Sequence, residues 1–157
     1  MHERDLKGAY NLLVNCGQAC EGERLLLCYE QKNLDFYDNA IVEDVWACAQ
    51  EIGLEVIPYE LDFDPVIDVV PKHLEAAIAA ADLTVFLARL ADQMRFGRFK
   101  SGQRTILSYA LNSASLASPF GTVHYKASLA LKQVIDAAVF GAGEVVVSCK
   151  AGTYFKG

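Results

Sequence analysis

The residues most suited to chemistry lie in a basic segment, 89–104. Five of its side chains are positive and one is negative, in a chain of net charge −6. The positive residues are Arg89, Arg95, Arg98, Lys100 and Arg104. Arginine pairs bidentately with carboxylates and phosphates, and Phe96 and Phe99 add apolar area that suits a peptide. The segment predicts a loop that grips a peptide carboxylate or acidic side chain through Arg89, Arg95 and Arg98. A solvated loop whose arginines pair with surface acids stays open as the alternative.

Other reactive side chains are scattered. The histidines have no second histidine three or four residues away, and the five cysteines show no metal-ligand spacing. His124 or a cysteine could still act in a small enzyme. The acidic stretch around Asp62 and Asp64 does not match a calcium loop, so we expect a solvated loop. The closely spaced pair Gly141 and Gly143 precedes a strand, unlike a dinucleotide fingerprint. We therefore expect no metal and no cofactor.

Composition limits the class of protein. The chain has 157 residues, of which 53% are hydrophobic and 22% charged, and this excludes intrinsic disorder. The length predicts one domain over residues 1–157. The acidic balance disfavours nucleic acid and anionic membranes as partners. No signal peptide or apolar run of membrane-spanning length is visible, so we expect a cytoplasmic protein with reduced thiols.

The hydrophobic pattern alternates helix and strand. Helices are expected over 6–14, 39–52, 71–81 and 122–140, and strands over 24–29, 54–61, 83–88, 104–109 and 144–149. Strands buried on both faces read as continuous apolar runs, and three of these segments, 25–27, 83–87 and 145–147, fit that description. Successive βα units with right-handed crossovers predict an α/β fold. We expect a three-layer sandwich with a mostly parallel sheet of about five strands.

Parallel sheets bind ligands in the crevice outside the carboxyl ends of their strands. Tyr29, Tyr59, Arg89 and Tyr109 fall at those ends. The tyrosines could supply hydroxyl groups to the rim of a crevice in which the basic segment takes the ligand. The sequence therefore predicts a peptide-binding crevice at this edge of the sheet.

Several stretches resemble one known family. Residues 11–30, with the run 22–24 leading into a Leu-rich strand, resemble the opening of the thermophilic-type metalloaminopeptidases and of the related dihydroxypyridine ring-cleaving dioxygenases. Residues 49–56 and 79–87 resemble the stretches that form their second and third strands. Residues 151–153 resemble the point at which that family's chain enters its catalytic domain. The resemblance covers nearly the whole chain.

The resemblance implies an N-terminal α/β domain without the C-terminal domain that holds the catalytic metal ligands. No catalytic residue can be carried over. The resemblance therefore implies a truncated hydrolase that has lost its catalytic function. Such domains resemble the peptide-binding accessory proteins of crocagin-type ribosomal peptide pathways. The expected role is to hold a precursor or core peptide for a maturation enzyme, as a homodimer. An assembly subunit of a larger hydrolase and a small enzyme remain the alternatives.

Overall fold

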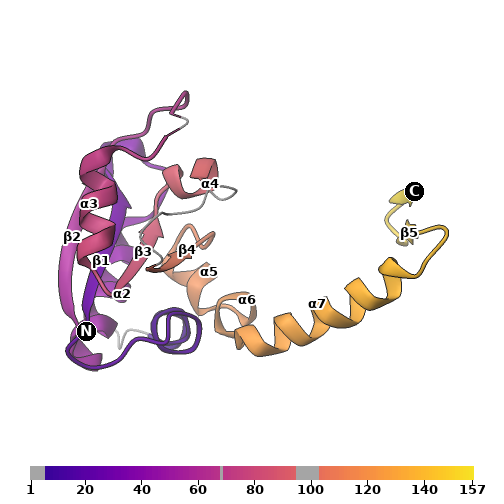
Figure 1. The fold of residues 1–157 in the computed structure, drawn as a ribbon, viewed down its shortest axis with the longest axis horizontal. Helices are drawn as coiled ribbons and strands as arrows, with labels where there is room; N and C mark the ends of the chain where they lie inside the picture. The colour runs from indigo at the N-terminus through magenta and orange to yellow at the C-terminus, as the bar shows by residue number, and fades with distance from the viewer. Residues whose placement is uncertain (1–5, 68, 95–102) are drawn as a thin grey trace. The chain divides into compact units, whose positions relative to one another are not determined.

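The structure is a computed structural model that describes residues 6–67, 69–94 and 103–157. Contacts along the chain divide it into two compact units, Met1–Val123 and His124–Gly157. Figure 1 follows the chain through both units. Each unit is described separately below.

The first unit is built on a four-stranded sheet with the order β2-β1-β3-β4. Its strands are β1 (Arg24–Glu30), β2 (Glu55–Leu61), β3 (Leu83–Leu87) and β4 (Arg104–Leu107). All neighbouring strands pair in parallel, and the central β1 sets Leu26 opposite Ile57 on one side and Thr84 on the other. The predicted α/β class with a mostly parallel sheet is confirmed. The parallel sheet has four strands, whereas about five were expected.

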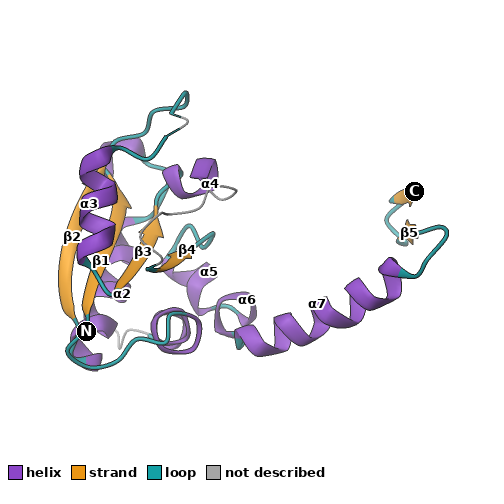
Figure 2. Ribbon diagram, in the orientation of Figure 1, coloured by secondary structure: helices purple, strands orange, loops and turns teal. Residues whose placement is uncertain are grey.

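Helices cover both faces of this sheet, which makes the three layers (Figure 2). The helical segments of the first unit are α1 (Lys7–Tyr10), η1 (Asn11–Cys16), η2 (Lys32–Leu34), α2 (Asn39–Ile52), α3 (Lys72–Ala80), α4 (Leu90–Met94), α5 (Ser113–Ala117) and α6 (Pro119–Thr122). One core cluster joins Leu25 and Leu27 to the helices α2 and α5. The other joins Leu26 and Cys28 to α3 and α4. Alternate residues of β1 thus enter opposite cores, as the two-residue period of a strand requires.

Local signals explain the ends of α2. The Asp38 side chain accepts a hydrogen bond from the backbone N–H of Ala40 and caps the first turn. The helix ends at Gly53, whose φ of 87° is the left-handed conformation that glycine adopts without steric cost. Ile41 and Val45 are buried on its inner face. The predicted bounds of this helix, 39–52, are confirmed. They could be predicted because the cap and the stop depend on neighbouring residues only.

The fifth predicted strand does not join the parallel sheet. It shortens to β5 (Val146–Ser148), which pairs antiparallel with β6 (Tyr154–Lys156) in a separate two-stranded sheet. The short connection contains Gly152 at a φ of 96°. A hairpin needs only such a tight turn, whereas a parallel pair needs a long crossover. The turn is compatible with the hairpin, which the sequence pattern did not predict.

The rest of the second unit is one helix, α7 (Tyr125–Phe140). Its predicted apolar face, Ala127, Leu131, Val134 and Ala138, is exposed, and no residue of 124–157 is buried. The unit thus contains no core of its own. Units this short seldom fold without disulfides, metals or a partner surface.

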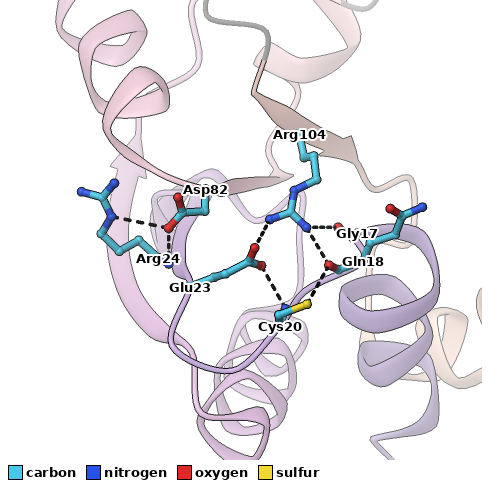
Figure 3. Close-up of polar contacts among 7 residues, drawn as sticks. All are labelled: Gly17, Gln18, Cys20, Glu23, Arg24, Asp82 and Arg104. Carbon is cyan, nitrogen blue, oxygen red and sulfur yellow. Dashed lines mark hydrogen bonds and ion pairs between the residues drawn. The ribbon is translucent and has the colours of Figure 1, made fainter.

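A polar network at the amino ends of the strands ties the first unit together (Figure 3). Arg104, the first residue of β4, donates to the carbonyl oxygens of Gly17 at 3.0 Å and Gln18 at 2.6 Å, just past the end of η1. It also pairs with Glu23 at 2.6 Å, and Glu23 in turn accepts from the backbone N–H of Cys20 at 2.9 Å. A cation is favourable beside helix C-terminal carbonyls. This network fixes the edge strand β4 to the loop that enters β1.

Candidate functional site

The carboxyl edge of the sheet contains the strongest candidate site. The chain runs from β1 to β2 on one side and returns to β3 on the other side of β1. The loops after β1 and β3 therefore diverge, and such a switch point is where parallel sheets form ligand crevices. Glu30 ends β1, and Arg89 lies two residues beyond the end of β3. These two residues meet at that point.

Glu30 and Arg89 form a bidentate ion pair. The Nε of Arg89 lies 3.0 Å from Oε1 and 3.1 Å from Oε2 of Glu30, and Nη2 lies 2.8 Å from Oε2. The backbone N–H of Arg89 also donates to Oε1. The Glu30 side chain is 3% exposed and that of Arg89 is 23% exposed. Burial of this carboxylate is tolerated because the arginine and an amide satisfy it.

Two aromatic rings hold the Arg89 guanidinium in place. Its Cζ lies 4.4 Å from the centre of the Phe36 ring and 3.7 Å from that of Phe63. Phe36 follows β1 and Phe63 follows β2, so three loops of the carboxyl edge converge on one cation. Arginine stacks on aromatic faces in this way. Arg89 is thus locked between Glu30, Phe36 and Phe63, and its Nε and Nη2 already bind a carboxylate of the same chain.

A pocket of about 280 Å³ opens beside this arginine. The loops that follow β1, β3 and β4 form its walls. Its lining residues are Phe36, Tyr37, Ala88, Arg89, Ala91, Asp92, Leu107, Ser108, Tyr109 and Leu111. Most of these side chains are apolar or aromatic, with a few polar groups among them. That composition is typical of binding pockets.

Hydrogen bonds between the loops brace the pocket. The backbone N–H of Asp38 donates to the carbonyl of Leu111 at 2.8 Å, and the Tyr37 hydroxyl donates to the carbonyl of Ser108 at 3.2 Å. Burial raises the pKa of Tyr37 to about 12, so its hydroxyl stays protonated and remains a donor. The Tyr109 hydroxyl donates to Oδ1 of Asp92 at 3.2 Å. The pocket is therefore preformed by contacts within the chain.

The structure brings together only part of the predicted site. Arg89 and Tyr109 both line the pocket. Tyr29 packs against the core on the α2 side of the sheet, and Tyr59 lies on the opposite side. The Tyr59 ring stacks on His73 with centroids 6.3 Å apart. Arg95, Phe96, Arg98 and Phe99 lie outside the described residues.

Glu30, Phe36, Phe63, Tyr37 and Asp92 were not singled out as site residues from the sequence. The adjacent aromatic residues at 36 and 37, directly after a buried strand, are the signal that could have pointed to the pocket. Glu30 also ends a strand, at the edge where ligands of parallel sheets bind. No sequence spacing links either feature to Arg89.

Local contacts or burial account for His124 and three of the cysteines, the candidate catalytic groups of a small enzyme. His124 caps α7, and its Nδ1 accepts from the backbone N–H of Lys126 at 3.2 Å. Burial raises the pKa of Cys28 and raises that of Cys48 to about 11. Cys149 is exposed, and hydrogen bonds from Thr153 lower its pKa. Within the described ranges, no group of three or more His, Cys, Asp or Glu side chains could hold a metal ion.

The two described aspartates of the acidic stretch bond to their own loop. Asp62 accepts from the backbone N–H of Phe63 at 2.8 Å, and Asp64 accepts from that of Val66 at 2.9 Å.

None of the helices in the described part of the chain reaches the length and apolar character needed to cross a bilayer.

Comparison with known proteins yields structural neighbours only. No protein-family model matches the chain, and no curated protein matches it. A 2,5-dihydroxypyridine dioxygenase from Pseudomonas putida KT2440 is similar in structure, with a TM-score of 0.53 and 16% identity. That likeness covers 96% of this chain and 46% of the dioxygenase, so the chain spans less than half of that enzyme.

Two further neighbours are more distant. VinN in complex with L-aspartate has a TM-score of 0.45 at 14% identity, over 96% of this chain and 37% of VinN. A fatty acid ABC transporter substrate-binding protein from Thermomonospora curvata has a TM-score of 0.42 at 22% identity, over 75% of this chain and 31% of that protein. The likeness to the dioxygenase, at a TM-score of 0.53 and 16% identity, shows a shared α/β fold alone.

Proposed function

We propose that this chain is a non-catalytic peptide-binding module that holds a precursor or core peptide for a maturation enzyme. The observation that carries the proposal is the pocket of about 280 Å³ at the carboxyl edge of the sheet. Its walls come from three separate loops that hydrogen bonds brace before any ligand arrives. Preformed walls favour binding because less conformational entropy is lost when the ligand arrives.

The charged residues at this edge support a binding role. Glu30 and Arg89 are committed to each other and act as a scaffold that fixes the position of Phe36. Tyr109 stands at the pocket with its side chain exposed and its hydroxyl directed at Asp92. A peptide that crosses these loops would insert a side chain into the pocket and leave its backbone at the rim. Tyr109 is the residue through which binding can be tested.

Isothermal titration of the purified chain, with and without zinc, tests the proposal. The ligands are peptides encoded by short reading frames beside the gene, with a random-library control. We expect a micromolar dissociation constant that is the same with and without zinc. Mass spectrometry should recover the peptide unchanged. Absence of binding to every peptide, or zinc-dependent cleavage, would overturn the proposal.

A pair of matched variants then localises the site. Tyr109→Ala should weaken binding about tenfold, since burial of an aromatic side chain is worth about 1.5–3 kcal/mol. Tyr154→Ala removes another exposed tyrosine, from β6, and should leave affinity unchanged. Equal affinities for the two variants would place the peptide elsewhere on the molecule.

A second candidate function, an assembly subunit, is favoured by the second unit. Leu131 and Val134 of α7 are 62% and 69% exposed, and no residue of 124–157 is buried. Apolar surface of this kind marks interaction sites. We expect this surface to be covered by a second copy or by a larger hydrolase that the chain completes.

Light scattering after size exclusion separates these outcomes. A homodimer has twice the chain mass of 17.2 kDa. Val134→Asp, on the apolar face of α7, should shift the species to the monomer. Gln133→Asp adds the same charge on the polar face and should not. A wild-type chain that stays at the monomer mass and does not copurify with a hydrolase would remove this candidate.

A further inference from the structure

The size of the pocket limits what can enter it. Ligand sites for whole drug-sized molecules span about 300–1,000 Å³, and this pocket, at about 280 Å³, lies at the small end. It has room for one side chain of a peptide rather than for a folded segment. The backbone of such a peptide would have to stay outside, against the rim.

The walls of the pocket suit a flat ring. Phe36, Tyr37 and Tyr109 contribute aromatic surface from two opposite loops, and Leu107 and Leu111 contribute aliphatic surface. Aromatic pairs gain from edge-to-face or offset contact beyond the area that they bury. Phe36 and Tyr37 already meet edge to face, with centroids 5.4 Å apart and planes at 64°. A third ring that enters the pocket could contact these rings in the same ways.

Charge argues against an anionic ligand here. The positive charge of Arg89 is matched at 2.8 Å by Glu30. Among the described residues that line the pocket, the other charged one is Asp92, which accepts a hydrogen bond from Tyr109. A carboxylate that enters would have to leave water and would meet an arginine that Glu30 already binds. This differs from the sequence-based expectation that Arg89 grips a peptide carboxylate.

We infer that the pocket receives a single uncharged aromatic side chain of the bound peptide and discriminates against a carboxylate. The inference rests on the proposed peptide-binding function and adds the chemical class of residue that the pocket selects. Selection comes from ring contacts within the braced walls, and a carboxylate gains no cation because Glu30 already binds Arg89. Arg89 acts as a positioning residue, because it holds Phe36 against the pocket instead of binding the ligand itself.

A set of blocked tripeptides tests the inference. The probes are N-acetyl-Gly-Xaa-Gly-amides in which Xaa is Tyr, Ala, Gln or Glu, titrated into the full chain by calorimetry or NMR. We expect the Tyr peptide to bind about tenfold or more tightly than the Ala peptide, from the apolar area that a ring buries. The Glu peptide should bind more weakly than the Gln peptide, which has the same shape without the charge.

A filled pocket provides the matched control. Leu111 is a half-exposed wall residue, and Leu111→Trp should occupy the space and abolish the preference for Tyr over Ala. Leu129→Trp, at a similarly exposed site on α7, should retain the preference. Thermal unfolding of both variants checks that each remains folded. If Leu111→Trp does not fold, Tyr109→Ala carries the same test by removing one wall.

The outcomes separate the inference from the proposed function. Tripeptides that bind with Glu preferred, or with no preference for Tyr, overturn the inference and leave the peptide-binding role in place. N-acetyl-tyrosine amide that binds while every longer peptide fails supports the pocket and overturns the peptide-binding role. No binding by any of these probes overturns both.

Discussion

Glu30, the last residue of β1, binds Arg89 beyond the end of β3 through both of its carboxylate oxygens, at 2.8–3.1 Å. The two residues are 59 positions apart in the chain. Their pairing joins the two central strands of the sheet at the switch point and leaves Arg89 stacked between Phe36 and Phe63. Stability and binding at this edge therefore depend on the same contact.

Loss of one partner of this pair should be costly. Glu30→Leu leaves Arg89 without its carboxylate and Arg89→Met leaves Glu30 without its cation, and we expect each to lower the free energy of unfolding by about 3 kcal/mol. The double variant Glu30→Leu with Arg89→Met should lose much less than the sum of the single changes. Urea unfolding of the four chains measures the coupling. Additive losses would mean that the ion pair contributes little.

The Glu23–Arg104 pair should make stability depend on pH. The hydrogen bond from Arg104 lowers the pKa of Glu23 below its ordinary value of 4.5. A lowered pKa in the folded state means that the folded protein releases this proton more readily than the unfolded chain does. The stabilisation is therefore fully present above about pH 4.5 and is lost as the pH falls through the lower folded value.

Unfolding free energies measured from pH 6 to pH 2 test this dependence. Arg104→Gln should flatten the acid limb of the curve, because Glu23 then loses the donor that lowers its pKa. Lys32→Gln removes one positive charge from η2, beyond the opposite end of β1 from Glu23, and should leave the acid limb intact. An unchanged acid limb in Arg104→Gln would contradict the assignment.

Gly8 is required by close packing. A Cβ built at this position lies 1.9 Å from the carbonyl oxygen of Leu116, which is backbone and cannot swing aside. Gly8→Ala should therefore destabilise the chain by about 1–3 kcal/mol, the usual cost of overpacking. Gly143→Ala is the control, since a Cβ there meets nothing within 4 Å. Equal melting temperatures for the two variants would show that α1 moves to make room.

The thiols should differ in reactivity. Hydrogen bonds from Thr153 lower the pKa of the exposed Cys149, while burial raises the pKa of Cys28 and Cys48. Only the thiolate is nucleophilic, so iodoacetamide at neutral pH should modify Cys149 in the folded chain and spare the two buried residues. Peptide mapping after a short exposure measures this order. Thr153→Val should slow the modification of Cys149, and rapid labelling of Cys28 would contradict its burial.

Much of the fold could be predicted because its signals are local. The bounds of α2 follow from a cap at Asp38 and a stop at Gly53, and the two central strands, β1 and β3, contain continuous apolar runs. The short helices α5 and α6 were not predicted. They depend on local side-chain caps, such as the mutual hydrogen bonds of Asn112 and Ser115, that a search for long periodic stretches overlooks.

The candidate site was less predictable than the fold. Residues that directly follow strands were sound candidates for the site. Parallel sheets bind ligands at the carboxyl ends of their strands, and this edge follows from topology alone. Strand ends do not reveal which face a side chain takes, and Tyr29 and Tyr59 in fact lie on opposite sides of the sheet. The sequence also revealed a surplus of arginine without showing that Arg89 is neutralised from within the chain.

The sequence by itself determined the longer elements of the sheet and its helices, their order and the class of fold, because helix caps, turn residues and hydrophobic period act over a few neighbouring positions. Only the tertiary structure decided that Glu30 meets Arg89, that three loops enclose one pocket, and that β5 pairs with β6 instead of β4. Each of these depends on which distant segments become neighbours. That choice is made by the packing of whole strands and helices, and no local pattern of residues encodes it.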